Sequence, residues 1–157
     1  MKIQFWTLGK AHESYIAEGV ERFTKRIKNY FPVSWQIIHP PKNLSALPEK
    51  VYKEKEAEQI LSMLKKEDFL ILLDETGKML SSPDLAKLLA QRADTGEKNL
   101  VFLIGGAYGV SQEIFERANY CWSLSKLVFP HQLVRLILAE QVYRACSILR
   151  NEKYHHE

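Results

Sequence analysis

The sequence predicts an α/β fold in which helices cover both faces of a mostly parallel sheet. Two continuous apolar runs, 69–73 and 100–104, contain no alternating polar residues, which is typical of strands buried on both faces of a parallel sheet. Patterns typical of helices separate these runs from each other and from shorter strand-like segments. Such an alternation of strands and helices indicates an α/β layer architecture.

The first half of the chain predicts two strands and two helices. Ile3–Leu8 is a short apolar run that stops at Gly9, and Val33–Ile38 is a second strand-like run. Between them a helix is predicted, ended by Pro32, from apolar residues at spacings of four and three: Ile16, Val20, Phe23, Ile27 and Tyr30. The charged segment 50–66 predicts another helix. Its charges indicate a solvated face, with contacts to RNA phosphates as the alternative.

The second half continues the alternation. The sequence Ser81-Ser82-Pro83-Asp84 predicts a helix start, because it combines a serine cap, a proline in the first turn and an acid near the helix N-terminus. We expect that helix to run to about Ala93. The remaining predicted elements are a strand at 100–104, a short helix capped by Ser111, a strand at 121–124 and a final helix at 130–150.

Composition indicates an ordinary globular protein. The 157 residues are 46% hydrophobic and 26% charged, and we expect them to form a single domain, 1–157. The formal net charge of +3 is compatible with nucleic-acid binding without requiring it. The N-terminus lacks the features of a signal peptide and no apolar run approaches the length of a membrane span, so we expect a cytoplasmic protein. Cys121 and Cys146 form no CxxC pair and are expected to be reduced.

The last third of the chain predicts a small-molecule pocket. The strand at 100–104 stops at Gly105-Gly106, where backbone can approach a ligand, and an apolar loop before Pro130 leads to His131 and Arg135 at the pocket mouth. An enzyme is therefore the leading hypothesis.

The glycines match neither GxGxxG nor a Walker loop, which disfavours a nucleotide-dependent oxidoreductase. An RNA-binding module without catalysis, using 50–66 and the tail, remains an alternative. The histidines lack metal-ligand spacing.

The final helix has more apolar surface than packing on one sheet requires. Val134, Ile137 and Leu138 lie on its broad apolar face, whereas Leu133 and Leu136 lie well away from the centre of that face. A second subunit that covers the excess is the favoured explanation, with the chain's own tail as the alternative. On the polar side, Glu140 and Arg144 have the spacing of a helix-surface ion pair.

Four separated stretches resemble one family: IGGAYGV at 104–110, LSKLVFPHQLVR at 124–135, AEQVYRA at 139–145 and YH at 154–155. The whole chain, including LDETGKMLSS at 73–82, is similar to the RlmH family of SPOUT-class methyltransferases, which methylate N3 of a pseudouridine in large-subunit (23S) ribosomal RNA. The resemblance implies a C-terminal trefoil knot, a homodimer that acts on the ribosome, S-adenosyl-L-methionine as cofactor and no metal.

The resemblance also implies the residues of the site. The cofactor contacts would be Leu73, Gly105, Leu124, Ser125, Lys126, Leu127, Val128 and Phe129. His131 is our first candidate for the base that removes the N3 proton, and His155 is the second. Arg135 and Arg144 would bind phosphate or stabilise the developing anion, and Tyr154 would stack on the splayed base.

Overall fold

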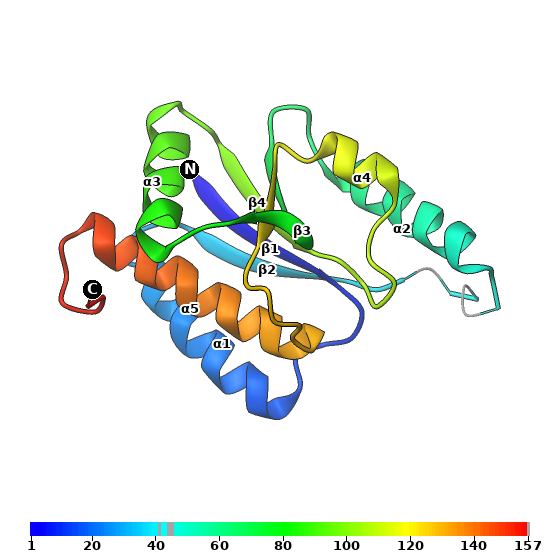
Figure 1. Cartoon of the computed structure of the whole chain (residues 1–157), viewed down its shortest axis with the longest axis horizontal. Helices are drawn as coiled ribbons and strands as arrows, with labels where there is room; N and C mark the ends of the chain where they lie inside the picture. The colour runs from blue at the N-terminus through cyan, green and yellow to red at the C-terminus, as the bar shows by residue number, and fades with distance from the viewer. Residues whose placement is uncertain (41, 44–45, 157) are drawn as a thin grey trace.

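The computed structural model describes residues 1–40, 42–43 and 46–156 and contains a five-stranded sheet of order β2-β1-β4-β3-β5 (Figure 1). Its strands are β1 (Lys2–Leu8), β2 (Val33–Ile38), β3 (Phe69–Met79), β4 (Asn99–Ile104) and β5 (Tyr120–Ser123). Its helices are α1 (Ser14–Ile27), α2 (Glu49–Met63), α3 (Ser82–Asp94), α4 (Gln112–Arg117) and α5 (His131–Leu149). All neighbouring strands pair in parallel, which confirms the predicted fold class.

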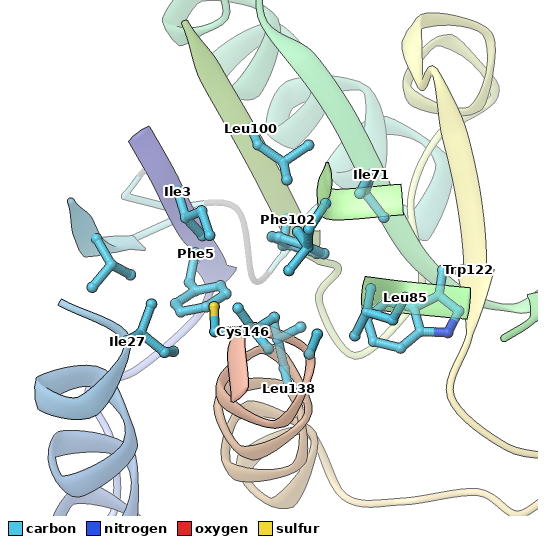
Figure 2. Close-up of a cluster of buried hydrophobic side chains, with 14 of the residues drawn as sticks. Ile3, Phe5, Ile27, Ile71, Leu85, Leu100, Phe102, Trp122, Leu138 and Cys146 are labelled. Carbon is cyan, nitrogen blue, oxygen red and sulfur yellow. The ribbon is translucent and has the colours of Figure 1, made fainter. Parts of the chain in front are cut away.

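The helices form two layers, one on each face of the sheet. Helices α1, α3 and α5 cover one face, and α2 and α4 cover the other (Figure 1). Figure 2 shows the larger core, where Phe5 and Phe102 of the central strands meet Leu138 of α5. The two faces of β1 and β4 are both buried because successive strand residues point to opposite sides. This explains why the strands are apolar without alternation.

Helix α5 lies between α1 and α3, and these two neighbours cover part of its apolar surface. Gly19 of α1 lets the helices approach closely, since a Cβ at that position would lie 2.6 Å from Cδ1 of Leu136. Part of the apolar excess predicted for the final helix is therefore covered within the chain itself. The apolar excess of α5 alone does not require a second subunit.

Strand β3 is longer than the apolar run that predicted it. The strand continues to Met79, with a register shift in which Trp122 of β5 is opposite both Leu73 and Lys78. Between these positions Asp74 accepts hydrogen bonds from the backbone N–H and hydroxyl of Thr76, at 2.9 and 2.6 Å. The apolar run at 69–73 did not predict this extension, because the residues of the extension are polar and half-exposed, as in a loop.

Most predicted helix starts are confirmed. The Ser81 hydroxyl accepts a hydrogen bond from the Asp84 backbone N–H at 3.2 Å, as expected of a cap. Ser111 does precede α4, but its side chain makes no capping hydrogen bond.

In the described part of the chain, no helix combines the length and apolar character needed to span a membrane. The trefoil knot stays a prediction.

Candidate active site

A cleft of about 1110 Å³ lies at the carboxyl ends of β4 and β5, beside residues 73–76 of β3, where the apolar part of that strand ends. Parallel strands bring their carboxyl ends to one edge of a sheet, and in open α/β folds ligands bind at that edge. Residues at these strands and the glycine loop, residues 105–109, line the cleft. The loop 124–129, the start of α5, and Glu49 and Lys53 of α2 line it as well.

All residues predicted to contact the cofactor line this cleft: Leu73, Gly105, Leu124, Ser125, Lys126, Leu127, Val128 and Phe129. Gly105 is buried, and a Cβ there would lie 2.9 Å from Cγ1 of Val110, the residue that follows the glycine loop. The absence of a side chain therefore allows the glycine loop to fold back on itself. Gly109, with φ of +78°, supplies the left-handed backbone conformation that turns the loop.

The loop 124–129 presents apolar side chains to solvent. Leu127 is 72% exposed and Val128 is 84% exposed, although a typical protein covers such side chains. Local hydrogen bonds hold the loop: the Ser123 hydroxyl donates to the carbonyl of Ser125, and the Ser125 hydroxyl accepts from the backbone N–H of Leu127. A fixed apolar loop with open backbone is suited to an apolar or aromatic ligand.

His131 and Arg135 have different environments although they lie one turn apart on α5. His131 lines the cleft, and partial burial together with the charge of Arg135 lowers the pKa of its imidazole below the usual value. Arg135 is only 2% exposed and donates to the carbonyl of Lys10 at 2.9 Å, with His12 Nδ1 3.3 Å away. The prediction that Arg135 lies at the pocket mouth is therefore wrong. Its placement supports a structural contact with the loop after β1.

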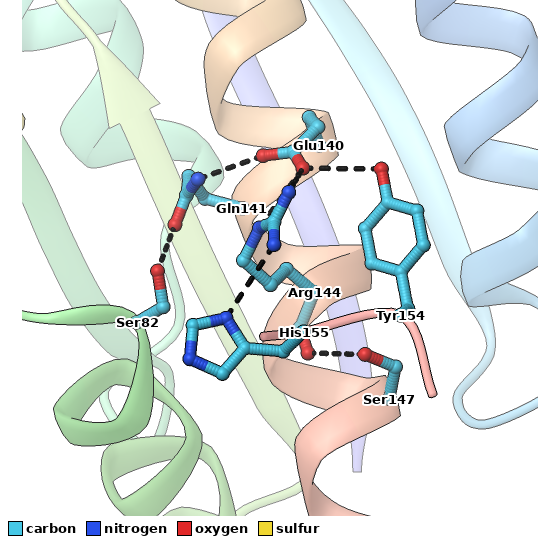
Figure 3. Close-up of polar contacts among 7 residues, drawn as sticks. All are labelled: Ser82, Glu140, Gln141, Arg144, Ser147, Tyr154 and His155. Atoms are coloured by element: carbon cyan, nitrogen blue, oxygen red, sulfur yellow. Dashed lines mark hydrogen bonds and ion pairs between the residues drawn. The ribbon is translucent and has the colours of Figure 1, made fainter. Parts of the chain in front are cut away.

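The C-terminal tail forms a polar cluster with α5, shown in Figure 3. We call Glu140, Gln141, Arg144, Tyr154 and His155 the tail cluster. Arg144 Nε donates to Glu140 Oε1 at 3.0 Å, which confirms the predicted ion pair, and Tyr154 donates to the same oxygen at 3.2 Å. Arg144 Nη1 lies 3.4 Å from His155 Nδ1, and the Tyr154 ring packs edge-on against Tyr143.

The tail cluster and the cleft occupy different parts of α5. At a rise of about 1.5 Å per residue, Glu140 and Arg144 lie roughly 14 and 20 Å along the helix axis from His131. Neither they nor Tyr154 and His155 line the cleft. The structure therefore brings the predicted cofactor residues and His131 together, and it brings Arg144, Tyr154 and His155 together elsewhere.

Sequence analysis missed Glu56, a buried carboxyl behind the glycine loop. This residue of α2 is 4% exposed, and the nearer of its carboxyl oxygens would lie 3.2 Å from a Cβ added at Gly106. Burial raises the pKa of Glu56 to about 7, and a hydrogen bond from Tyr52 opposes this effect. In the sequence Glu56 is one acid among many in a charged helix, so no local signal distinguishes it.

No metal site is apparent among residues 1–40, 42–43 and 46–156: these contain no group of three or more His, Cys, Asp or Glu side chains arranged to hold an ion. Cys121 and Cys146 are free thiols in the structure. Burial raises the pKa of both, most strongly for Cys146, to about 12. Protonated thiols at neutral pH are poor nucleophiles and ligands.

Comparison with known proteins gives one consistent result. The family model described as "Predicted SPOUT methyltransferase" matches residues 1–155. A protein of Cytophaga hutchinsonii named ribosomal RNA large subunit methyltransferase H is 44% identical over 99% of this chain and its own full length. Proteins of the same name from Flavobacterium johnsoniae and Parabacteroides distasonis are 44% and 43% identical, each over the full length of both chains.

Proposed function

This chain belongs to the SPOUT methyltransferase family, and from that premise we propose that it methylates N3 of a pseudouridine in large-subunit ribosomal RNA. The observation that carries the proposal is the cleft at the carboxyl ends of β4 and β5 and beside residues 73–76 of β3, lined by the residues that family resemblance assigns to the cofactor. The names of the full-length relatives support the substrate class. We place the activity in the cytoplasm, where ribosomes are found.

We propose S-adenosyl-L-methionine as the methyl donor. The cleft fits an adenosyl group because the loop 124–129 offers apolar side chains with open backbone, and the glycine loop leaves its backbone free of side chains at 105 and 106. When bound, this cofactor supplies an activated methyl group on a positively charged sulfur. The protein's own contribution is to exclude water and to align the donor with the acceptor.

His131 is the group we propose to accept the N3 proton. It lies on the cleft wall, and its lowered pKa keeps the imidazole neutral at pH 7, which is the form that can take up a proton. Its backbone position at the first residue of α5 fixes it relative to the loop 124–129. His155 remains the second candidate, held near Arg144 in the tail cluster.

We propose that the working unit is a homodimer in which the tail cluster of one copy completes the cleft of the other. The separation along α5 argues that a single copy cannot bring Tyr154 to its own cleft. The exposed Leu127 and Val128 at the cleft, together with the exposed Tyr15 near the start of α1, provide apolar surface for the second copy. Tyr154 would then stack on the splayed base while Arg144 binds phosphate or the developing anion.

Gly105→Ala is expected to weaken S-adenosyl-L-methionine binding at least tenfold, because the new methyl group would lie 2.9 Å from Cγ1 of Val110. This β-branched side chain turns less freely than the end of a leucine, so the glycine loop would have to shift. Isothermal titration calorimetry measures the change. The double variant Gly105→Ala/Val110→Ala removes the clashing methyl and should recover most of the affinity. Unchanged binding by Gly105→Ala would argue against the cleft as the cofactor site.

The activity itself is tested on ribosomes. We expect purified protein, incubated with labelled S-adenosyl-L-methionine and ribosomes that lack the modification, to label one pseudouridine of the large-subunit RNA, which mass spectrometry of RNA fragments identifies. Binding of RNA with no binding of the cofactor would favour an RNA-binding module. Binding of a nicotinamide nucleotide in the cleft would favour an oxidoreductase instead.

A further inference from the structure

Glu56 is a buried acid whose position next to the candidate cofactor cleft has no structural explanation. It lies on the side of α2 that faces the sheet, close to Ala57 and Ile60 of the smaller core. Its carboxyl group approaches the glycine loop at Gly106, a residue that lines the cleft. Because Gly106 has no side chain, this carboxyl group can lie against the backbone of a residue that lines the cleft.

The groups around Glu56 leave its charge uncompensated. Tyr52, one turn earlier on α2, donates a hydrogen bond to it, and Tyr108 of the glycine loop packs edge-on against Tyr52. The nearby Lys53 pairs with Glu49 at 3.6 Å instead. Within the described residues, no ion pair reaches Glu56, and helix α4, which also packs on α2, contributes the apolar Ile114 to this core. A buried carboxylate without a counter-charge is costly, so it favours any cation that binds close by.

We propose that Glu56 is a specificity residue that makes the cleft prefer the positively charged methyl donor over the neutral product left after methyl transfer. The inference rests on the proposed function. Methyl transfer converts a sulfonium into a neutral thioether, so donor and product differ by one methyl group and one charge. A carboxylate behind the glycine loop acts on the charge through space without touching the ligand.

The protonation state of Glu56 gives this role a measurable signature. With its pKa raised to about 7, about half of the Glu56 carboxyls are protonated in the empty protein at pH 7. A bound cation favours the ionised form and lowers that pKa, so S-adenosyl-L-methionine should release roughly half a proton on binding at pH 7. Its affinity should rise as the pH rises through 7. S-adenosyl-L-homocysteine has a neutral sulfur and should release less.

The test compares the two ligands by titration calorimetry in buffers of different ionisation enthalpy, which reports the number of protons released. For Glu56→Gln we expect proton release to disappear and the affinity ratio to move on the order of tenfold toward S-adenosyl-L-homocysteine, as loss of one partly screened charge predicts. Glu58→Gln is the matched control, because that acid lies on the same helix but is exposed and pairs with Lys55. Glu58→Gln should change neither the number of protons released nor the ratio of the two affinities.

Tyr52→Phe is the second variant and keeps the carboxyl group in place. Loss of the hydrogen bond that favours the ionised form should raise the pKa of Glu56 and move the midpoint of proton release to higher pH. Equal losses of affinity for both ligands in Glu56→Gln, or proton release by the wild type that is the same for both, would overturn the proposal. If neither ligand binds the wild type, the proposed function itself fails.

Discussion

Gly77→Ala should lower the free energy of unfolding by about 3 kcal/mol or more. A Cβ at this position would lie 2.6 to 2.7 Å from three backbone atoms of Cys121 and Trp122 in β5. Backbone of a paired strand cannot move aside as a side chain can, so the extension of β3 would have to leave β5 where Lys78 pairs with Trp122. Because this extension also lines the cleft, we expect cofactor affinity to fall as well.

Urea unfolding followed by circular dichroism measures the change in stability, and Gly19→Ala provides the control. There the added Cβ would lie 2.6 Å from Cδ1 of Leu136, which is the flexible end of a side chain, and alanine favours the helix. We expect the control to change stability by about 1 kcal/mol at most. Equal losses of stability from the two substitutions would show that β3 and β5 do not pack as closely at Gly77 as the geometry indicates.

Tyr154→Ala should reduce methylation of ribosomes by about a hundredfold or more while changing cofactor affinity less than twofold. The residue lies in the tail cluster and does not line the cleft, so its loss should remove the proposed contact with RNA and leave cofactor binding intact. Tyr154→Phe keeps the ring and loses only the hydrogen bond to Glu140, and should retain most of the activity. Single-turnover methylation assays and calorimetry separate the two effects.

Mixing two impaired variants tests whether the tail acts on the other copy, at a concentration of S-adenosyl-L-methionine so low that clefts carrying Gly105→Ala stay largely empty. If Tyr154→Ala and Gly105→Ala subunits are unfolded, mixed in equal amounts and refolded, half of the dimers carry one of each. Each mixed dimer then has one site with an intact cleft and an intact tail, so about a quarter of wild-type activity should return. A tail that serves its own cleft would give no recovery. A monomer in sedimentation at micromolar concentration would contradict the dimer directly.

The elements of this protein follow from local sequence, and so do the glycine and apolar segments that line the cleft, whereas the individual cofactor residues came from the family resemblance. The apolar runs at 69–73 and 100–104 predicted β3 and β4, and the glycine and leucine motifs that follow the strands line one cavity. This succeeded because parallel strands end at the same edge of a sheet, so residues just after different strands meet there whatever their separation in sequence. The extension of β3 to Met79 and the neighbours of the side chains on α5 could not be predicted from local sequence.

The sequence by itself determined the order of strands and helices and the glycine-rich and apolar segments that build the cleft. Only the tertiary structure decided that Arg135 is buried against the loop after β1, that the tail cluster lies away from the cleft, and that Glu56 lies behind Gly106. The physical reason is that periodicity records which residues share a face of a helix, whereas the neighbour of that face depends on how distant elements pack.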